Sequence, residues 1–99
     1  MKIQILTEAL FDLEEGHQFY ENQDTGLGGY FLNALFSDID SLALNGGIHP
    51  KIQGYHRRLS NHFPYAVYYA LRDNVVEVWR VLDCRQDPAR IRRQLGRTK

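Results

Sequence analysis

The clearest pattern of apolar and polar positions lies in the second half of the chain, between Phe63 and Arg85. Tyrosine, valine and tryptophan, whose side chains pack well on a pleated surface, dominate two runs on either side of Asp73-Asn74. Both residues of this dipeptide tolerate positive φ, so the pattern predicts a β-hairpin with Asp73-Asn74 as its loop. Pro64 has no N–H to donate and marks the entry of the first strand.

This loop also predicts which residues share a face of the hairpin. One side is mostly apolar and is assigned to the core, with these facing pairs: Leu71 and Val76, Tyr69 and Val78, Val67 and Arg80, Tyr65 and Leu82. The opposite side mixes aromatic area with charge and includes Tyr68 and Trp79. Because a charge on the core face must be paired, we expect Arg80 to bind a helix carboxylate such as Asp12 or Asp38.

The first half of the chain predicts a strand and two helices. Residues 2–6 alternate, and Thr7 offers an N-cap hydroxyl for a helix over residues 8–23. The apolar stripe of this helix is Ala9, Leu13, Gly16 and Tyr20, widened by Leu10. A second helix is expected from Leu27 until Asn45-Gly46-Gly47 stops it, with this stripe: Phe31, Leu32, Leu35, Ile39 and Leu42.

Two further elements complete the expected fold. Residues 51–59 predict an edge strand beside the hairpin, and Asp87 caps a short basic helix over Pro88–Leu95 that ends at Gly96. The order β-α-α-β-β-β-α predicts an α+β fold: a helical hairpin on one face of a small, mostly antiparallel four-stranded sheet. The other face is expected to be largely open, and residues 1–99 form a single domain.

Charge divides the chain, although the formal net charge is zero. Residues 1–50 hold one basic and eight acidic residues, whereas residues 51–99 hold eleven basic and four acidic ones. The two regions either serve two partners or neutralise each other. One cysteine excludes an internal disulfide, no apolar run is long enough for a membrane span, and acidic residues soon after Met1 argue against a signal peptide, so a cytoplasmic protein is expected.

Most catalytic patterns are missing from the sequence. The four histidines and Cys84 have no metal-ligand spacing, and no cofactor or metal is expected. Gly26-Leu27-Gly28-Gly29 is better explained as a helix junction than as a phosphate loop, because no strand precedes it and no Lys-Ser/Thr follows.

Arginines carry the strongest functional signal. Arg57, Arg58, Arg80 and Arg85 come from strands expected to be neighbours, and Arg97 and Lys99 extend the positive charge to the end of the chain. Guanidinium groups beside aromatic rings bind phosphates, bases or an acidic peptide, and the alternative is a solvated charged face. The candidate residues for target or partner binding are Arg57, Arg58, Tyr68, Trp79, Arg85, Arg90, Arg92 and Arg93.

Several motifs, in order, resemble the RelE/ParE superfamily of toxins from type II toxin–antitoxin modules. They span nearly the whole chain: Leu-x-Asp-Leu-Glu-Glu from Leu10 to Glu15, Phe19-Tyr20-Glu21, Gly26-Leu27-Gly28 with Phe31 three residues later, Phe63-Pro64-Tyr65-Ala66-Val67-Tyr68-Tyr69, Val76-x-Val78-x-x-Val81-Leu82-Asp83-x-Arg85, and Asp87-Pro88. The resemblance implies a β-α-α-β-β-β core with the first strand beside the last. It also implies a hetero-oligomer with a cognate antitoxin.

Two activities divide that family, and the resemblance favours the ParE-like one. RelE-like members are ribosome-dependent mRNA endonucleases, and their pattern would assign catalysis here to Arg85 with Arg58. However, Ser60 holds the upstream arginine position, and Ile91 lies about where a C-terminal tyrosine would fall. ParE-like members inhibit DNA gyrase and have no agreed catalytic set, so the resemblance implies a plasmid-stabilisation type of toxin that is not an enzyme. A third alternative is a non-toxic remnant that retains antitoxin binding.

The antitoxin is expected to cover exposed apolar area on the two helices. Its tail would add a strand or a helix over Phe11, Tyr30 and Phe36, while its acidic residues reach the C-terminal arginines.

Overall fold

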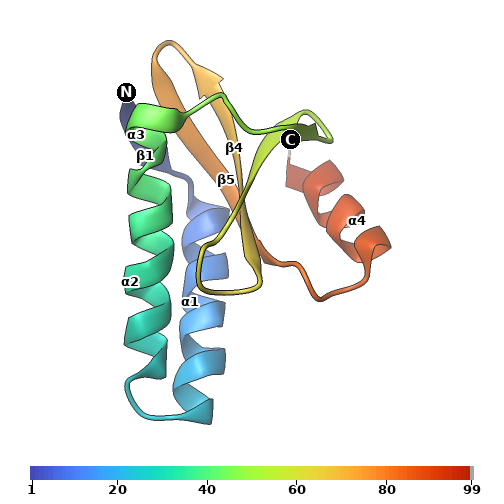
Figure 1. The fold of residues 1–99 in the computed structure, drawn as a ribbon. Coiled ribbons are helices and arrows are strands. Elements are labelled where there is room, and N and C mark those ends of the chain that lie inside the picture. Colours follow the sequence, from blue (N-terminus) through green and yellow to red (C-terminus); the bar gives the residue numbers. More distant parts are fainter. Residues whose placement is uncertain (99) are drawn as a thin grey trace.

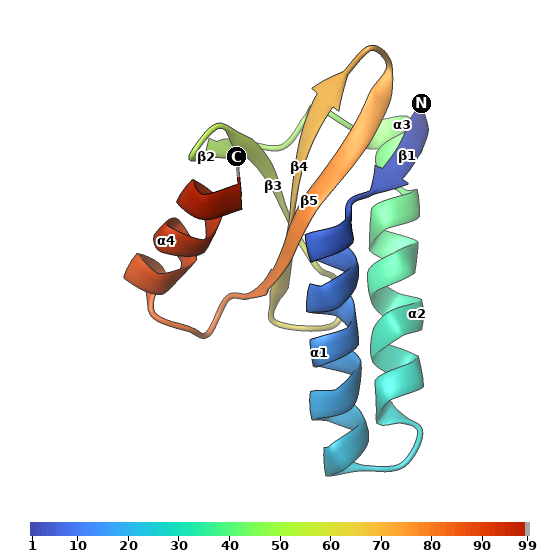
Figure 2. The ribbon, with the colours of Figure 1, turned by 180° about the vertical axis from the view of Figure 1, so that it is seen from behind.

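The computed structural model of the protein describes residues 1–98. Its elements are β1 (Lys2–Ile5), α1 (Thr7–Gln23), α2 (Leu27–Asp40), α3 (Leu42–Asn45), β2 (Lys51–Ile52), β3 (Tyr55–Leu59), β4 (Tyr65–Arg72), β5 (Val75–Asp83) and α4 (Pro88–Thr98). The antiparallel pair α1 and α2 lies on one face of the sheet and extends beyond it, and α4 lies on the other face (Figure 1, Figure 2). The expected α+β class with a helical hairpin on one face is therefore confirmed.

The sheet has five strands in the order β1-β5-β4-β3-β2, not the four that were predicted. β1 lies beside β5, as the family resemblance implies; this pair is parallel, and the other neighbours are antiparallel. The extra strand arises because the predicted edge strand over residues 51–59 folds back on itself. Gln53 (φ 56°) and Gly54 (φ 83°) form a two-residue turn between β2 and β3.

The central hairpin turns at Asp73 and Asn74, which both have positive φ as predicted. Near the turn the predicted register is confirmed, with Leu71 facing Val76 and Tyr69 facing Val78. Beyond Tyr69 the register is wrong by one residue. A β-bulge places Val67 opposite Val81, Ala66 opposite Leu82 and Tyr65 opposite Asp83.

The bulge exchanges the faces of two residues that follow it. Val81 belongs to the core under α1 and α2, where Leu82 was expected. Leu82 instead lies in a second apolar cluster on the opposite face. An extra residue in one strand reverses the inward and outward alternation after it, so the predicted faces hold only on the turn side of the bulge.

The helical stripes form the main core, as predicted for α1 at Ala9, Leu13, Gly16 and Tyr20. Leu10 was placed in this stripe wrongly, because it is 47% exposed. The predicted N-cap at Thr7 is also wrong, since Leu6 is the cap residue and makes no side-chain bond. The second stripe is confirmed, with Leu32 only partly buried, but the helix is interrupted at Ser41 into α2 and α3.

The two long helices approach each other closely at Gly28. A Cβ atom added there would lie 2.6 Å from the backbone oxygen of His17 and 2.9 Å from Cβ of Glu21. Its neighbour Gly29 has nothing within 4 Å of an added Cβ. The glycine-rich junction therefore serves close helix packing at one position only.

Because of this difference, substitution of alanine should change the free energy of unfolding in opposite directions at the two positions. We expect Gly28→Ala to lower the free energy of unfolding by about 1–3 kcal/mol, because the helices must separate to admit a methyl group. We expect Gly29→Ala to raise it by about 0.5–1 kcal/mol, because alanine favours the helix. Urea unfolding followed by circular dichroism measures both, and a Gly28→Ala variant as stable as the wild type would contradict the close approach.

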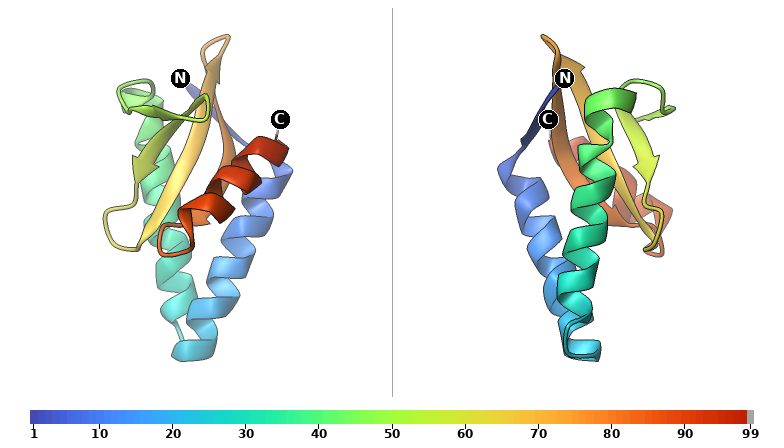
Figure 3. Two further views of the ribbon diagram at one scale, coloured as in Figure 1. Left: turned by 90° about the vertical axis from the view of Figure 1, so that its right-hand side faces the viewer. Right: turned by 60° about the vertical axis from the view of Figure 1, so that its left-hand side comes forward.

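The second face of the sheet was expected to be largely open, and that expectation is wrong. α4 lies across the face of the sheet opposite α1 and α2 (Figure 3). It packs Leu95 and Ile91 onto Tyr55, Ala66, Tyr68 and Leu82, with Trp79 beside them. Asp87 caps α4 as predicted, since its Oδ1 accepts the Ala89 N–H at 3.0 Å. The helix continues through Gly96 to Thr98 rather than ending at Leu95.

Candidate functional site

The candidate arginines do not form one cluster. Arg57 and Arg58 line a hollow beside β3, together with His49, Pro50, Leu59 and Asn61. Arg85 lies near a second cleft, between α1 and α4, to which Arg90 contributes. Arg92 and Arg93 are exposed on α4, and Lys99 lies outside the described residues. The strand arginines, which were expected to converge on one surface, therefore lie in two separate places.

Arg80 is a structural residue, as expected, and its partner is Asp12 rather than Asp38. Its Nε and Nη2 donate to the two oxygens of Asp12 at 2.7 and 2.9 Å, and Glu8 lies 3.5 Å from its Nη1. Asp12 also accepts the backbone N–H of Val81 at 2.9 Å. The hydrogen bonds from Arg80 to Asp12 raise the pKa of the guanidinium, so Arg80 keeps its charge in this ion pair.

Arg58 is bound by residues at the C-terminal end of α2. Its Nη1 lies 3.3 Å from Asp38 and donates to the Leu59 carbonyl at 2.6 Å, and its Nε donates to the Ser41 hydroxyl at 3.3 Å. Asp38 is only 3% exposed and also accepts a hydrogen bond from the Ser60 hydroxyl at 2.6 Å. This network ties β3 to the end of α2.

Arg85 offers a guanidinium that is held in place yet half exposed. Asp83 accepts hydrogen bonds from its Nε at 3.0 Å and its Nη2 at 2.8 Å, and the group lies 5.8 Å from the ring centre of Phe19. These bonds raise the pKa of Arg85 and lower the pKa of Asp83. Arg85 reaches α1 through the Tyr20 hydroxyl at 3.4 Å, whereas Arg58 reaches α2, so they serve different sites.

Tyr68 and Trp79 do not form the open aromatic surface that was expected. Tyr68 is 1% exposed under α4, and its hydroxyl accepts a hydrogen bond from Arg57 Nε at 3.3 Å. Trp79 is partly buried, with its indole N–H enclosed and unpaired among the described residues. In this arrangement Tyr68 positions Arg57 and offers no ring face to a partner.

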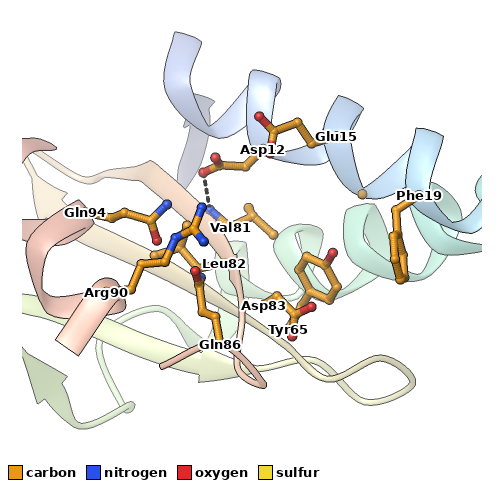
Figure 4. A pocket seen from close by; sticks show the side chains of 11 residues that line it. Asp12, Glu15, Phe19, Tyr65, Val81, Leu82, Asp83, Gln86, Arg90 and Gln94 are labelled. Carbon is orange, nitrogen blue, oxygen red and sulfur yellow. Dashed lines mark hydrogen bonds between the residues drawn. The ribbon is translucent and has the colours of Figure 1, made fainter. Parts of the chain in front are cut away.

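The cleft between α1 and α4 was missed in the sequence, because it exists only where α4 packs beside the end of β5. Its volume is about 380 Å³. Figure 4 shows the side chains that line it. It is lined by Asp12, Glu15, Gly16, Phe19, Tyr65, Val81, Leu82, Asp83, Gln86, Arg90 and Gln94. Burial, followed by the charge of Asp83, raises the pKa of Tyr65 to about 12, so its hydroxyl remains protonated. The sequence carried a signal only for its α1 wall, in the helical spacing of Asp12, Glu15 and Phe19 on one stripe.

The hollow beside β3 draws its charge from arginine alone. Burial, followed by the charges of Arg58 and His56, lowers the pKa of His49, so its imidazole is neutral at neutral pH. His49 Nδ1 and the Tyr69 hydroxyl share a hydrogen bond at 2.5 Å. The hollow therefore takes its positive charge from Arg57 and Arg58.

The backbone amides of the glycine-rich junction bind a carboxylate of the protein itself. The carboxylate of Glu21 accepts the Gly26 N–H at 3.0 and 3.2 Å and the Gly28 N–H at 3.0 Å. These backbone bonds lower the pKa of Glu21. The amides that a phosphate would use are therefore occupied by a side chain of α1.

Several large apolar side chains of the helical hairpin face solvent. The three expected to meet an antitoxin are exposed by 64% at Phe11, 53% at Tyr30 and 37% at Phe36. Within residues 1–98, no three histidine, cysteine or acidic side chains gather closely enough to hold a metal ion. The helices of this part of the chain are also too short or too polar to cross a membrane.

Comparison with known proteins supports the fold. No family model matches the chain, and the curated proteins gave no match. Among solved structures, a chain of the "Chromosomal ParDE TA system from P. aeruginosa" has a similar fold, with a TM-score of 0.70 and 15% sequence identity. The match covers 82% of this chain and 92% of that chain. At this identity the similarity shows a shared fold.

Proposed function

We propose that this protein is the toxin of a type II toxin–antitoxin pair, that it is ParE-like, and that it inhibits DNA gyrase until a cognate antitoxin neutralises it. The observation that carries the proposal is the fold shared with a chain of a ParDE system over most of both chains. The ordered motifs of the sequence support the same assignment.

The arrangement of the arginines favours a binding toxin over a nuclease. A nuclease would need basic groups gathered around one phosphate. Here Arg58 is bound to Asp38, and Arg85 is bound to Asp83 at a different site. Ser60 donates to Asp38, and Ile91 packs from α4 against the sheet, so neither supplies an acid or base at the positions where the nuclease pattern needs one.

Two surfaces are available for the antitoxin in this proposal. The exposed rings of Phe11, Tyr30 and Phe36 offer apolar area on the helical hairpin, which a partner would bury. Arg90, Arg92 and Arg93 offer exposed positive charge on α4. An antitoxin tail with apolar and acidic residues fits both surfaces and gives a hetero-oligomer.

Expression without the antitoxin tests the proposal. We expect growth arrest with filamentation and DNA-damage signalling, because a poisoned gyrase leaves broken DNA. Cellular mRNA should remain intact. Expression of the Arg85→Ala variant should likewise leave the mRNA intact. Intact DNA with cleaved translated mRNA would instead support the RelE-like alternative. Harmless expression of a folded product would support a remnant that retains only antitoxin binding.

A further inference from the structure

The end of β5 has an open edge. β1 pairs with β5 only from Val75 to Val78, whereas β5 continues to Asp83. The Tyr65 carbonyl accepts the Ser60 N–H on the β3 side, so Asp83, which faces Tyr65, turns its backbone groups away from β4. The backbone groups of Val81 also point away from β4, and the Val81 N–H donates a hydrogen bond to the Asp12 carboxylate. The Val81 carbonyl and both backbone groups of Asp83 therefore face the cleft between α1 and α4.

The two walls of this cleft have opposite charge. α1 contributes Glu15, and α4 contributes Arg90 and Gln94 from the other side of the β5 edge (Figure 4). Asp12 and Asp83 are already occupied by arginines, but neither Glu15 nor Arg90 takes part in an ion pair recorded within residues 1–98. Phe19 adds an aromatic surface beside Glu15. The cleft thus offers backbone groups between a carboxylate and a guanidinium that form no ion pair within residues 1–98.

We propose that this cleft binds a short extended segment of the antitoxin by strand addition to the β5 edge, and that the segment carries a basic and an acidic residue at adjacent positions. Successive side chains of a strand point to opposite faces of the sheet. Since α1 and α4 lie on opposite faces, a basic residue directed to Glu15 requires its neighbour in sequence to face Arg90. The inference rests on the proposed function for the identity of the partner.

A peptide backbone is the occupant that the cleft fits. Unpaired N–H and C=O groups of a strand edge are matched by another main chain, and side-chain pockets on either face give specificity. A volume of about 380 Å³ is enough for a few residues and not for a long strand. Charge complementarity then determines which sequence binds.

Two synthetic peptides of identical composition test this pattern. Both are capped hexapeptides of valine and threonine with one arginine and one glutamate, which are adjacent in the first peptide and separated by one residue in the second. Adjacent charges face the two walls, whereas separated charges face the same wall. Titrated into the isotope-labelled full chain, the adjacent-charge peptide should bind about fivefold more tightly and shift the amide signals of Val81 and Asp83.

Variants of α1 supply the matched control. Glu15→Gln should weaken the adjacent-charge peptide about fivefold, while Glu14→Gln, on the next exposed position outside the cleft, should leave its affinity unchanged. Equal affinity for both peptides, or signal shifts elsewhere on the protein, would overturn the inference.

The failure of this inference is distinguishable from failure of the proposed function. Glu15→Lys should release the protein from its antitoxin in a co-purification assay. If the antitoxin neutralises Glu15→Lys as well as the wild type, the cleft is not its site, although the toxin assignment stands. If the wild type is not toxic and binds no antitoxin, the proposed function itself is wrong.

Discussion

Asp12→Ala is expected to lower the free energy of unfolding by about 3–5 kcal/mol, among the largest effects of any single substitution in this chain. Asp12 and Arg80 are nearly enclosed, with side chains 10% and 12% exposed, and Asp12 accepts three hydrogen bonds from Arg80 and Val81. Removing the carboxylate leaves a buried guanidinium without its main partner. Because a guanidinium does not deprotonate, it cannot escape by losing its charge.

Chemical denaturation with urea measures this loss, and two further variants identify its cause. Glu8→Gln should cost at most about 1 kcal/mol, because Glu8 is exposed and 3.5 Å from Arg80. Asp12→Leu combined with Arg80→Met should be more stable than Asp12→Ala alone, since no unpaired charge remains. A double variant as unstable as the sum of its single variants would show that shape, and not charge, governs this site.

Phe31→Ala is expected to cost about 3–5 kcal/mol. Phe31 is fully buried, and its ring contacts those of Tyr20, Phe63 and Tyr65, with centroid distances of 5.1, 5.1 and 4.9 Å. A Cβ on Gly16 would lie 2.4 Å from the ring, so the absence of a side chain at Gly16 makes room for it. Alanine at position 31 would leave a cavity at the junction of both helices and the sheet.

Phe11→Ala is the matched control, because the same side chain is removed from an exposed position. Its free energy of unfolding should stay within about 0.5 kcal/mol of the wild type. Under the proposed function it should nevertheless weaken the antitoxin complex, as measured by calorimetric titration. A Phe31→Ala protein of wild-type stability would refute the packing account, and unchanged antitoxin binding by Phe11→Ala would remove that ring from the interface.

Local signals in the sequence were sufficient for most elements. The stripe ending at Tyr20 identifies the buried face of α1, and Asp73-Asn74 identifies the hairpin turn, because spacing and positive φ are properties of a few neighbouring residues. The short strand β2 was missed because Gln53 adopts a positive φ that its residue type does not indicate. The bulge after Tyr69 has no local signature either, and it places Val81 in the core against expectation.

One contact near the cleft, the ion pair of Arg80, was predicted from the sequence because a charge on a mostly apolar face needs an opposite charge. Arg80 on a mostly apolar face required a carboxylate, and Asp12 supplies it. The cleft at Glu15 and Arg90 could not be predicted, because it depends on how α4 packs against the far face of the sheet. The same packing buries Tyr68, which the sequence placed on an open surface.

The structure also explains the uneven charge along the chain. Arg80 with Asp12 and Arg58 with Asp38 each join a basic residue of the second half to an acidic residue of the first. Part of the asymmetry is therefore neutralised inside the fold. The arginines of α4, including Arg90, Arg92 and Arg93, remain exposed and are the charges that a partner would meet.

Gyrase inhibition in a purified system tests the central proposal most directly. The purified protein is added to purified DNA gyrase and relaxed plasmid, and in parallel to a translating extract in which mRNA is followed. The proposal predicts loss of supercoiling or accumulation of cleaved plasmid, relieved by the antitoxin, with mRNA unchanged. Full gyrase activity together with mRNA cleavage that Arg85→Ala abolishes would contradict it.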